Sequence, residues 1–384
     1  MKILIFTVSA GEGHNSMSRA VRDYIGGAYP DAEVRIYDLF KDGEQTKRKK
    51  RAVWLVNDGY FKLVKYAIGI ANRQYERLKR RSAEKPAKTL RKNFIAPARK
   101  GVEEIMDAFR PDSVFCAHTY AGILMADLRR EGNESAMRAR IATVVSDYDV
   151  APYTELLTGL DYIITPTDDF DGVLLESGFD LSKRRSYGIP VQRKFSQYME
   201  KSEALRTLGL KEGKKTLMIM SGSIGFGNIA KTILNFNKCR SDFRILCVCA
   251  RNKKLKEKLE KLQARGRLKK EIHIFGYVNN VEVLMSASDV LLGKIGGVAI
   301  AEAFNKYLPI IADKKLPFQE YDNMVFLRAR NACDYISCKR KAYLVADRFF
   351  GDEARLVAML KEIEVLRRPD ASKDIGDLIC HERA

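Results

Sequence analysis

Short apolar runs alternate along the chain with longer stretches in which apolar residues recur at helical spacing. Runs of this length are typical of buried strands, and the stretches between them are typical of amphipathic helices. In the first half the predicted strands are Ile3–Val8, Glu33–Tyr37, Ser113–Ala117, Ile141–Val145, Tyr162–Thr165 and a strand near Tyr187. In the second half they are Thr216–Met220, Arg244–Ala250, Glu271–Phe275, Val290–Leu292 and Pro309–Ala312. Because continuous apolar strands separated by helices are buried on both faces, the pattern predicts an α/β protein with two parallel sheets.

The two halves meet near residue 195. Gly188-Ile189-Pro190-Val191 closes the first strand–helix series, and a charged helical pattern follows at Met199–Leu208. At 384 residues the chain is long enough for two domains with sizeable cores. We therefore predict domains at 1–195 and 196–384, each a doubly wound sheet that binds ligands at the carboxyl ends of its strands.

The composition is that of a soluble globular protein, with 46% hydrophobic and 30% charged residues. The seven cysteines have no CxxC spacing, and Cys247 and Cys249 fall in a strand pattern, so buried free thiols in a reducing cytoplasm are expected. The apolar opening, Met1–Ala10, leads at once into a glycine-rich loop and a helix, which indicates a first strand rather than a signal peptide. No uninterrupted apolar run reaches about 18 residues, so no membrane-spanning helix is predicted.

Positive charge is concentrated in one segment. The net charge is +19, and residues 41–100 hold 19 Lys and Arg against 5 Asp and Glu. Such a block attracts phosphates, either of nucleic acid or of an anionic lipid surface. Within it, the stretch Ala52–Ile70 predicts an amphipathic helix. Its apolar face holds Val53, Val56, Tyr60, Leu63, Val64 and Ala67, with Trp54 and Phe61 beside it and Arg51, Lys62 and Lys65 at its flanks. This pattern favours shallow insertion at an anionic membrane surface, and the alternative is a core-facing helix with a solvated basic face.

A glycine-rich turn follows the predicted strand that ends at Leu292. Gly293 precedes the pair Gly296-Gly297, and a helical pattern then runs to Phe304. Glycines at a strand-to-helix junction let backbone N–H groups approach a diphosphate, and Glu302 would accept hydrogen bonds from a sugar diol. After the next strand, Gln319, Glu320 and Asn323 suit hexose hydroxyls. Together these features predict a nucleotide-sugar site, and the alternative is an ordinary βα turn with a surface glutamate.

A second candidate site lies in the first half. The loop Ser9–Asn15 follows the first strand and places Gly13 and His14 at a helix start. With an ordinary pKa near 6.5, His14 is the candidate general base for an acceptor hydroxyl, and the alternative is a capping histidine. Asp147 follows another strand and would orient His14 or act as the base itself. Asp147-Tyr148-Asp149 is also a DxD triplet, which binds a divalent metal in a different class of fold, but we expect no metal here.

These motifs resemble those of the monogalactosyldiacylglycerol synthase and processive diacylglycerol glucosyltransferase group of GT-B glycosyltransferases. That family carries Lys-Pro-Gly-Gly, then Thr-x-Ser-Glu-Ala, then Pro-Gly-Gln-Glu. The corresponding segments here are Lys294-Ile295-Gly296-Gly297, Ala299-Ile300-Ala301-Glu302-Ala303 and Pro317-Phe318-Gln319-Glu320. The family's opening Ser-Ala-Gly-x-Gly-His is matched by residues 9–14, and its Thr-Asp-Phe by Ser146-Asp147-Tyr148. The chain departs from the family where it has Ile295 instead of proline, and it lacks the histidine that follows Thr-Asp-Phe.

Four further segments resemble family motifs. They are Cys116-Ala117-His118-Thr119, Ser221-Gly222-Ser223, Cys249-Ala250-Arg251-Asn252 and Phe275-Gly276-Tyr277-Val278. The resemblance implies that His118 lines the acceptor site, Ser223 contacts the diphosphate or the acceptor, and Arg251 lies beside the nucleotide. Tyr277 would form a wall next to the uracil. The alternatives are a structural histidine at 118 and a simple tight turn at 223.

The resemblance also implies a fold and an activity. Two Rossmann-like domains would face each other across a cleft, the first binding acceptor and membrane and the second binding the UDP-sugar. The last helices, about Asp352–Leu366, would return to the first domain. The expected enzyme is an inverting hexosyltransferase without cofactor that moves a hexose, glucose by our expectation, from a UDP-sugar to a diacylglycerol-type lipid at the cytoplasmic face of the cell membrane.

Three alternatives stay open from the sequence. A lipid-linked peptidoglycan-type N-acetylglucosaminyltransferase would keep the fold and change the substrates. A UDP-sugar 2-epimerase would also use two such domains, but it has no need of the basic amphipathic segment. A nucleic-acid-binding protein would account for the charge but would leave the glycine turns and Glu302 without a purpose, so no nucleic-acid partner is expected.

Overall fold

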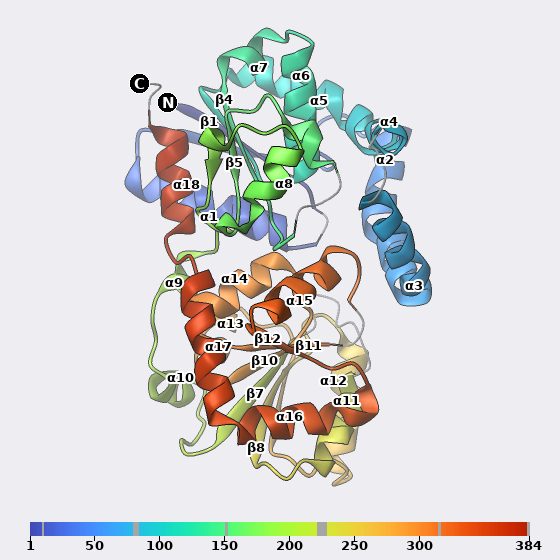
Figure 1. Ribbon diagram of the computed structural model, residues 1–384, viewed down its shortest axis with the longest axis vertical. Coiled ribbons are helices and arrows are strands. Elements are labelled where there is room, and N and C mark those ends of the chain that lie inside the picture. Colours follow the sequence, from blue (N-terminus) through green and yellow to red (C-terminus); the bar gives the residue numbers. More distant parts are fainter. Residues whose placement is uncertain (10, 80–83, 150–152, 221–228, 314–315, 382–384) are drawn as a thin grey trace. The chain divides into compact units, whose positions relative to one another are not determined.

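The computed structural model describes residues 1–9, 11–79, 84–149, 153–220, 229–313 and 316–381, except for several side chains within 57–86 and that of residue 339. The chain divides into two compact units. The first comprises Met1–Arg193, Pro317–Gln319 and Arg368–Ala384, and the second comprises Lys194–Leu316 and Glu320–Arg367. Each unit holds one six-stranded parallel sheet with helices around it (Figure 1).

The first sheet has the strand order β2-β1-β3-β4-β5-β6. Its strands are β1 (Lys2–Thr7), β2 (Glu33–Asp38), β3 (Ser113–Cys116), β4 (Arg140–Val144), β5 (Tyr162–Ile164) and β6 (Arg184–Arg185). The helices of this unit are α1 (Gly13–Ala28), α2 (Lys47–Trp54), α3 (Tyr60–Lys79), α4 (Glu84–Leu90), α5 (Ala96–Phe109), α6 (Thr119–Arg130), α7 (Glu134–Arg138), α8 (Asp171–Glu176) and α18 (Ala371–Cys380). The predicted alternation of strand and helix is confirmed, with strand ends displaced by one or a few residues.

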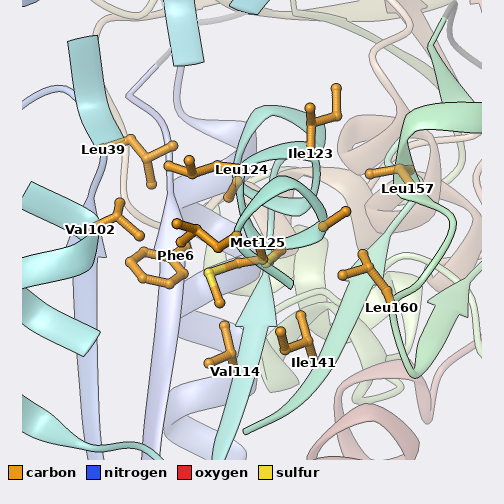
Figure 2. Close-up of a cluster of buried hydrophobic side chains, with 14 of the residues drawn as sticks. Phe6, Leu39, Val102, Val114, Ile123, Leu124, Met125, Ile141, Leu157 and Leu160 are labelled. Atoms are coloured by element: carbon orange, nitrogen blue, oxygen red, sulfur yellow. The ribbon is translucent and has the colours of Figure 1, made fainter. Parts of the chain in front are cut away.

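Apolar periodicity explains how these elements pack. In α1 the buried residues Met17, Ala20, Val21 and Ile25 recur at helical spacing on one side of the helix. One face of the first sheet carries a core in which side chains from β1, β3 and β4 meet those of α5 and α6 (Figure 2). Strands of this kind need cover on both faces, which the helices supply.

The C-terminal helix packs against the first helix of the chain. Figure 1 shows α18 beside α1, and the hydroxyl groups of Tyr24 and Tyr29 donate hydrogen bonds to Asp377 at 2.8 and 2.9 Å. A methyl group at Gly376 would lie 2.4 Å from the Tyr24 ring, so the close approach requires glycine. The segment Asp352–Leu366 forms α17 (Glu353–Leu366) of the second unit, and the chain rejoins the first unit from Arg368 onward.

The second sheet has the strand order β12-β11-β10-β7-β8-β9. Its strands are β7 (Lys215–Met220), β8 (Phe243–Val248), β9 (Ile272–Phe275), β10 (Val290–Gly293), β11 (Ile310–Ala312) and β12 (Cys333–Tyr335). Its other helices are α9 (Arg193–Ser196), which begins on the last residue of the first unit, α10 (Lys201–Thr207), α11 (Ile229–Asn235), α12 (Lys253–Ala264), α13 (Val281–Ser286), α14 (Gly297–Asn305), α15 (Gln319–Ala329) and α16 (Ala342–Gly351). The edge strand β12 was not predicted, because a run of three residues that contains Asp334 has no apolar pattern.

The predicted single helix over Ala52–Ile70 is wrong. The helix α2 ends at Trp54, a π-helical turn spans Leu55–Gly59, and α3 is interrupted at Ala67, whose φ of −137° is not helical. Val53 and Val56, expected on the exposed apolar face, pack against the core of the first unit. The first part of this segment is therefore anchored to the fold, as in the core-facing alternative.

Candidate active site

The carboxyl ends of β1 and β3 lie next to each other in the first sheet. After β1 the chain leads toward β2 on one side, and β3 lies on the other, so the strand order reverses at this point. Crevices at such reversals are the usual ligand sites of doubly wound sheets. The loop after β1 delivers Gly13 and His14 at the start of α1, and the turn after β3 delivers His118 as the N-cap of α6. The fold thus brings together two histidines that the sequence analysis had singled out separately.

His14 is held in one tautomer. Its Nδ1 lies 2.8 Å from the carbonyl oxygen of Ala117, which can only accept a hydrogen bond. The Nδ1 atom therefore carries the proton, and the Nε2 atom keeps its lone pair. Burial lowers the pKa of His14 below 6.5, against the opposing effects of this hydrogen bond and of the charge on Asp147. At neutral pH the imidazole is consequently a neutral base.

His118 is held in the opposite tautomer. Its Nδ1 accepts a hydrogen bond of 3.0 Å from the backbone N–H of Tyr120, so Nδ1 is unprotonated. Burial, with the neighbouring His14 as a smaller cause, lowers the pKa of His118 well below its ordinary value. A neutral ring with a bare Nδ1 carries its proton on Nε2. The ring centroids of His14 and His118 are 4.4 Å apart.

Asp147 follows β4 and is partly buried. The Ser146 hydroxyl donates a hydrogen bond of 3.3 Å to its Oδ2 atom. Its negative charge raises the pKa of His14, which is the electrostatic effect expected of an orienting carboxylate. Among the described residues, no group of three or more His, Cys, Asp or Glu side chains could hold a metal ion, and this includes Asp147 and Asp149.

A polar network that sequence reasoning missed braces the loop after β1. The Thr7 hydroxyl donates to the Asn15 side chain at 3.0 Å, and the Asn15 amide donates to the Ser9 hydroxyl at 3.1 Å. The Ser9 hydroxyl in turn donates to Asp38, at the end of β2. The ends of β1 and β2 and the first turn of α1 are thereby tied together, which fixes the position of His14. The available signal was Asn15, which directly follows the histidine of the motif.

In the second sheet the corresponding reversal lies between β7 and β10. Gly293 pairs with Met220 at the carboxyl ends of these strands, and a methyl group on Gly293 would lie 1.9 Å from the Met220 carbonyl oxygen. Only glycine permits this approach. The residues that follow, Lys294 to Gly296, connect β10 to α14, where Gly296 is the N-cap and Gly297 the first helical residue. A methyl group on Gly296 would contact nothing within 4 Å, so the space beside its Cα atom is open.

Two contacts tie this turn to α15. The ammonium group of Lys294 forms an ion pair with Glu320, and the Asn323 amide donates a hydrogen bond of 3.0 Å to the carbonyl oxygen of Ile295. Asn323 is fully buried, so in this structure it can influence a ligand only through the turn. Glu320 is also buried, whereas Gln319, the first residue of α15, is partly exposed.

Glu302 lies near the end of α14. Burial raises its pKa to about 8, and the negative charge of Glu282 adds to this while Lys194 opposes it. Lys194 itself pairs with Glu282 at 2.9 Å. The Glu302 carboxyl group is therefore mostly protonated at pH 7.

Arg251 and Tyr277 lie close together, near the edge of the second sheet that β8 and β9 form. They follow β8 and β9, and the Arg251 guanidinium lies 5.6 Å from the centroid of the Tyr277 ring. Both side chains are exposed. The sequence named each of them separately, and the parallel pairing of β8 with β9 brings them together. Ser223 lies outside the described residues.

The positively charged segment, residues 41–100, presents both apolar and charged side chains. Trp54, Leu63 and Ile70 are 47%, 37% and 61% exposed. Around Trp54, the α2 residues Lys47, Arg48, Lys50 and Arg51 are exposed as well. Lys49 is buried instead, because its ammonium group donates a hydrogen bond to the Asp42 carbonyl group, and burial lowers its pKa.

The side chains of Phe61, Lys62 and Lys65 lie outside the described part of the structure. None of the described helices is both long and apolar enough to cross a membrane.

Comparisons with known proteins agree in sequence and in fold. The family model for monogalactosyldiacylglycerol (MGDG) synthase matches residues 14–191. A processive diacylglycerol beta-glucosyltransferase from Bacillus cytotoxicus is 24% identical over 99% of this chain and 94% of its own length.

Two solved structures resemble the whole fold. MurG of Acinetobacter baumannii has a TM-score of 0.62 at 12% identity, covering 98% of this chain and 99% of its own. A putative UDP-N-acetylglucosamine 2-epimerase from Listeria monocytogenes has a TM-score of 0.60 at 13% identity, covering 98% and 94%. At these identities the structures establish the fold, while the sequence match carries the family resemblance. Together they confirm that this chain has the two-sheet fold of the GT-B glycosyltransferases and resembles the monogalactosyldiacylglycerol synthase and processive diacylglycerol glucosyltransferase group.

Proposed function

We propose that this protein is an inverting glycosyltransferase that moves glucose from UDP-glucose to a diacylglycerol-type lipid. The observation that carries the proposal is the pair of sites at the strand-order reversals. The first unit holds a neutral histidine with an available base nitrogen, and the second holds a glycine turn at a helix start with Glu302 on the same helix. The sequence relative named above acts on diacylglycerol by its name.

His14 would start the reaction. Its Nε2 atom takes the proton of the acceptor hydroxyl, the hydroxyl oxygen forms a bond to the anomeric carbon, and the bond from that carbon to the diphosphate oxygen breaks. UDP leaves with the electron pair, and the imidazolium later returns its proton to solvent. A single displacement inverts the anomeric centre. Asp147 would stabilise the imidazolium by its charge.

The donor would bind to the second unit without an obligatory metal. The N–H groups at Gly296-Gly297 and the helix dipole of α14 stabilise negative charge on the diphosphate. Glu302 would hold the ribose diol, and Arg251 with Tyr277 the nucleotide edge. Gln319 belongs to the first unit, and its contact with the hexose remains a prediction. Lys294, Glu320 and Asn323 would support the turn, and contact between Ser223 and the diphosphate remains a prediction.

The acceptor lies in a bilayer, so the enzyme would work as a peripheral protein at the cytoplasmic face of the cell membrane. Trp54, Leu63 and Ile70 would enter the interface, and the exposed Lys and Arg side chains of α2 would supply attraction to anionic lipid. The predicted contribution of Phe61, Lys62 and Lys65 is part of the same proposal.

The decisive experiment supplies the purified protein with radiolabelled UDP-glucose, UDP-galactose or UDP-N-acetylglucosamine. Vesicles of phosphatidylglycerol and diacylglycerol serve as acceptor. We expect labelled glycolipid from UDP-glucose, retained when EDTA is present. If no donor labels any lipid, the transferase proposal is wrong, and if only UDP-galactose does, the choice of glucose is wrong.

The structural likeness to a 2-epimerase makes that activity the second candidate. It would appear in the same experiment as conversion of UDP-N-acetylglucosamine in the absence of lipid. The exposed apolar and basic side chains of the segment around α2 and α3 favour the lipid-dependent reaction.

A further inference from the structure

His118 occupies the middle of a row of four aromatic rings. Its ring centroid lies 4.4 Å from that of His14 and 4.5 Å from that of Tyr120, whose ring stacks on Phe94 at 5.3 Å. Tyr120 and Phe94 are packed against the core of the first unit. The His118 ring therefore contacts a ring that is itself anchored to the core, which restricts its movement.

The hydrogen bond at Nδ1 prevents a flip of the His118 ring. If the ring flipped, its Nδ1 atom would lose the backbone N–H of Tyr120, which has no partner within the helix because it lies in the first turn of α6. The Nε2–H group is left as a donor. Among the described residues no hydrogen-bond partner of this Nε2 is found, and the ring is only partly buried.

Helix capping alone does not account for a histidine here. Ser, Thr, Asp and Asn are the preferred N-cap residues, and each would satisfy the Tyr120 N–H without placing a large ring beside His14. The imidazole adds one property that these caps lack, namely a second nitrogen that carries a fixed proton.

The two rings carry complementary hydrogen-bonding atoms. His14 offers a lone pair at Nε2, and His118 offers a proton at Nε2. The two rings are neighbours, with their centroids 4.4 Å apart. A hydroxyl group suits the pair, because it donates one hydrogen bond and accepts another.

We propose that His118 positions the acceptor by donating a hydrogen bond from Nε2–H to the attacking hydroxyl oxygen, whose proton points to Nε2 of His14. This role rests on the transferase reaction proposed above. The hydrogen bond directs the O–H bond toward the base and the remaining oxygen lone pair toward the anomeric carbon. His118 takes no proton itself, because its donor nitrogen is already protonated.

The test uses His118→Asn and His118→Ser, which retain a good N-cap but have no atom at the place of Nε2. We expect both variants to unfold at nearly the wild-type temperature and to bind UDP with unchanged affinity. Their kcat/KM for the lipid acceptor should fall about tenfold or more, because a hydrogen bond to the reacting group is lost. His118→Ala, which also removes the cap, should in addition unfold at a lower temperature.

The outcomes separate this role from the proposed function. Wild-type protein that transfers no sugar would overturn the proposed function and this role with it, whereas active wild type with an equally active His118→Asn would overturn this role alone. Nitrogen-15 NMR of the histidines gives a readout that does not depend on turnover. His118 should show a protonated Nε2 and a bare Nδ1, with the reverse at His14, and a protonated Nδ1 at His118 would overturn the assignment.

Discussion

The centroids of the His14 and His118 imidazole rings lie 4.4 Å apart, and the two rings are protonated on opposite nitrogens. Each tautomer is imposed by a backbone group, the Ala117 carbonyl for one ring and the Tyr120 N–H for the other. Two backbone groups only three positions apart in the chain thus give neighbouring histidines different chemistry. One is a base and the other is a donor, and neither needs a change of protonation to reach that state at neutral pH.

Replacing His14 with alanine should lower kcat by about 10²–10⁴-fold, because the general base is lost. UDP binding should not change, since His14 lies in the first unit. Because burial lowers the pKa of His14, the wild-type rate should stay high as the pH falls to 6.5 and decline only below it, as the ring becomes protonated. His273→Gln is the matched control, because His273 pairs with Glu271 in the second unit at 2.9 Å. A rate that already halves near pH 7.5 would contradict this assignment.

UDP binding should release a proton from Glu302. The carboxyl group is protonated below its pKa of about 8, whereas a ribose diol that donates hydrogen bonds favours the carboxylate. Affinity for UDP should therefore rise between pH 6 and pH 8, by at most tenfold per pH unit, and level off above that. Calorimetry in buffers of different ionisation enthalpy measures the proton directly.

Glu302→Gln should bind UDP more weakly at pH 8 and lose this pH dependence. Glu260→Gln is the control, because Glu260 is an exposed residue of α12 that pairs with Lys256. Affinity that falls as the pH rises would exclude the proposed contact between Glu302 and the ribose.

Gly293→Ala should destabilise the second unit. The added methyl group would meet the Met220 carbonyl oxygen at 1.9 Å, so β7 and β10 would have to separate where the donor turn begins. We expect a loss of about 1–3 kcal/mol in the free energy of unfolding, together with weaker UDP binding. Gly276→Ala provides the comparison, because a methyl group there would meet only the Lys256 side chain at 3.8 Å. Equal denaturant midpoints for the two variants would show that β7 and β10 can separate without cost.

Trp54→Ser and Ile70→Ser should each weaken binding to vesicles that contain phosphatidylglycerol. Each substitution removes an exposed apolar side chain from the segment proposed to enter the interface. Binding of the wild type should also fall as the salt concentration rises, because the basic segment supplies the attraction. Tyr198→Ser, at an exposed aromatic residue of the second unit, is the control in the same flotation assay. Unchanged flotation of both variants would remove this segment from the membrane contact.

The sequence by itself determined the local structure of this protein. Apolar runs predicted ten of the strands seen in the described residues, because a buried parallel strand must be apolar on both faces. The two polar edge strands were harder to predict: β6 lies at Arg184–Arg185, beside the strand expected near Tyr187, and β12 was missed. The sequence also predicted the glycine-rich turns, because the close backbone approach at a strand-to-helix junction such as Gly293 leaves little room for a side chain. The resemblance to a glycosyltransferase family rested on these turns and on His14.

Only the tertiary structure decided which residues meet and in what state. His14 and Ala117 are separated by 103 positions, and no periodicity shows that a carbonyl group will set the tautomer of that histidine. The protonation of Glu302 depends on burial and on Glu282, and Asn323 serves the turn from a fully buried position. The segment Ala52–Ile70 has the same helical pattern whether it faces lipid or a core, and packing of Val53 and Val56 assigns its first part to the core. The tautomers, the protonation state of Glu302 and the packing of this segment depend on burial and on hydrogen-bond geometry. Both arise from contacts between residues far apart in the chain, which the pattern of the sequence does not show.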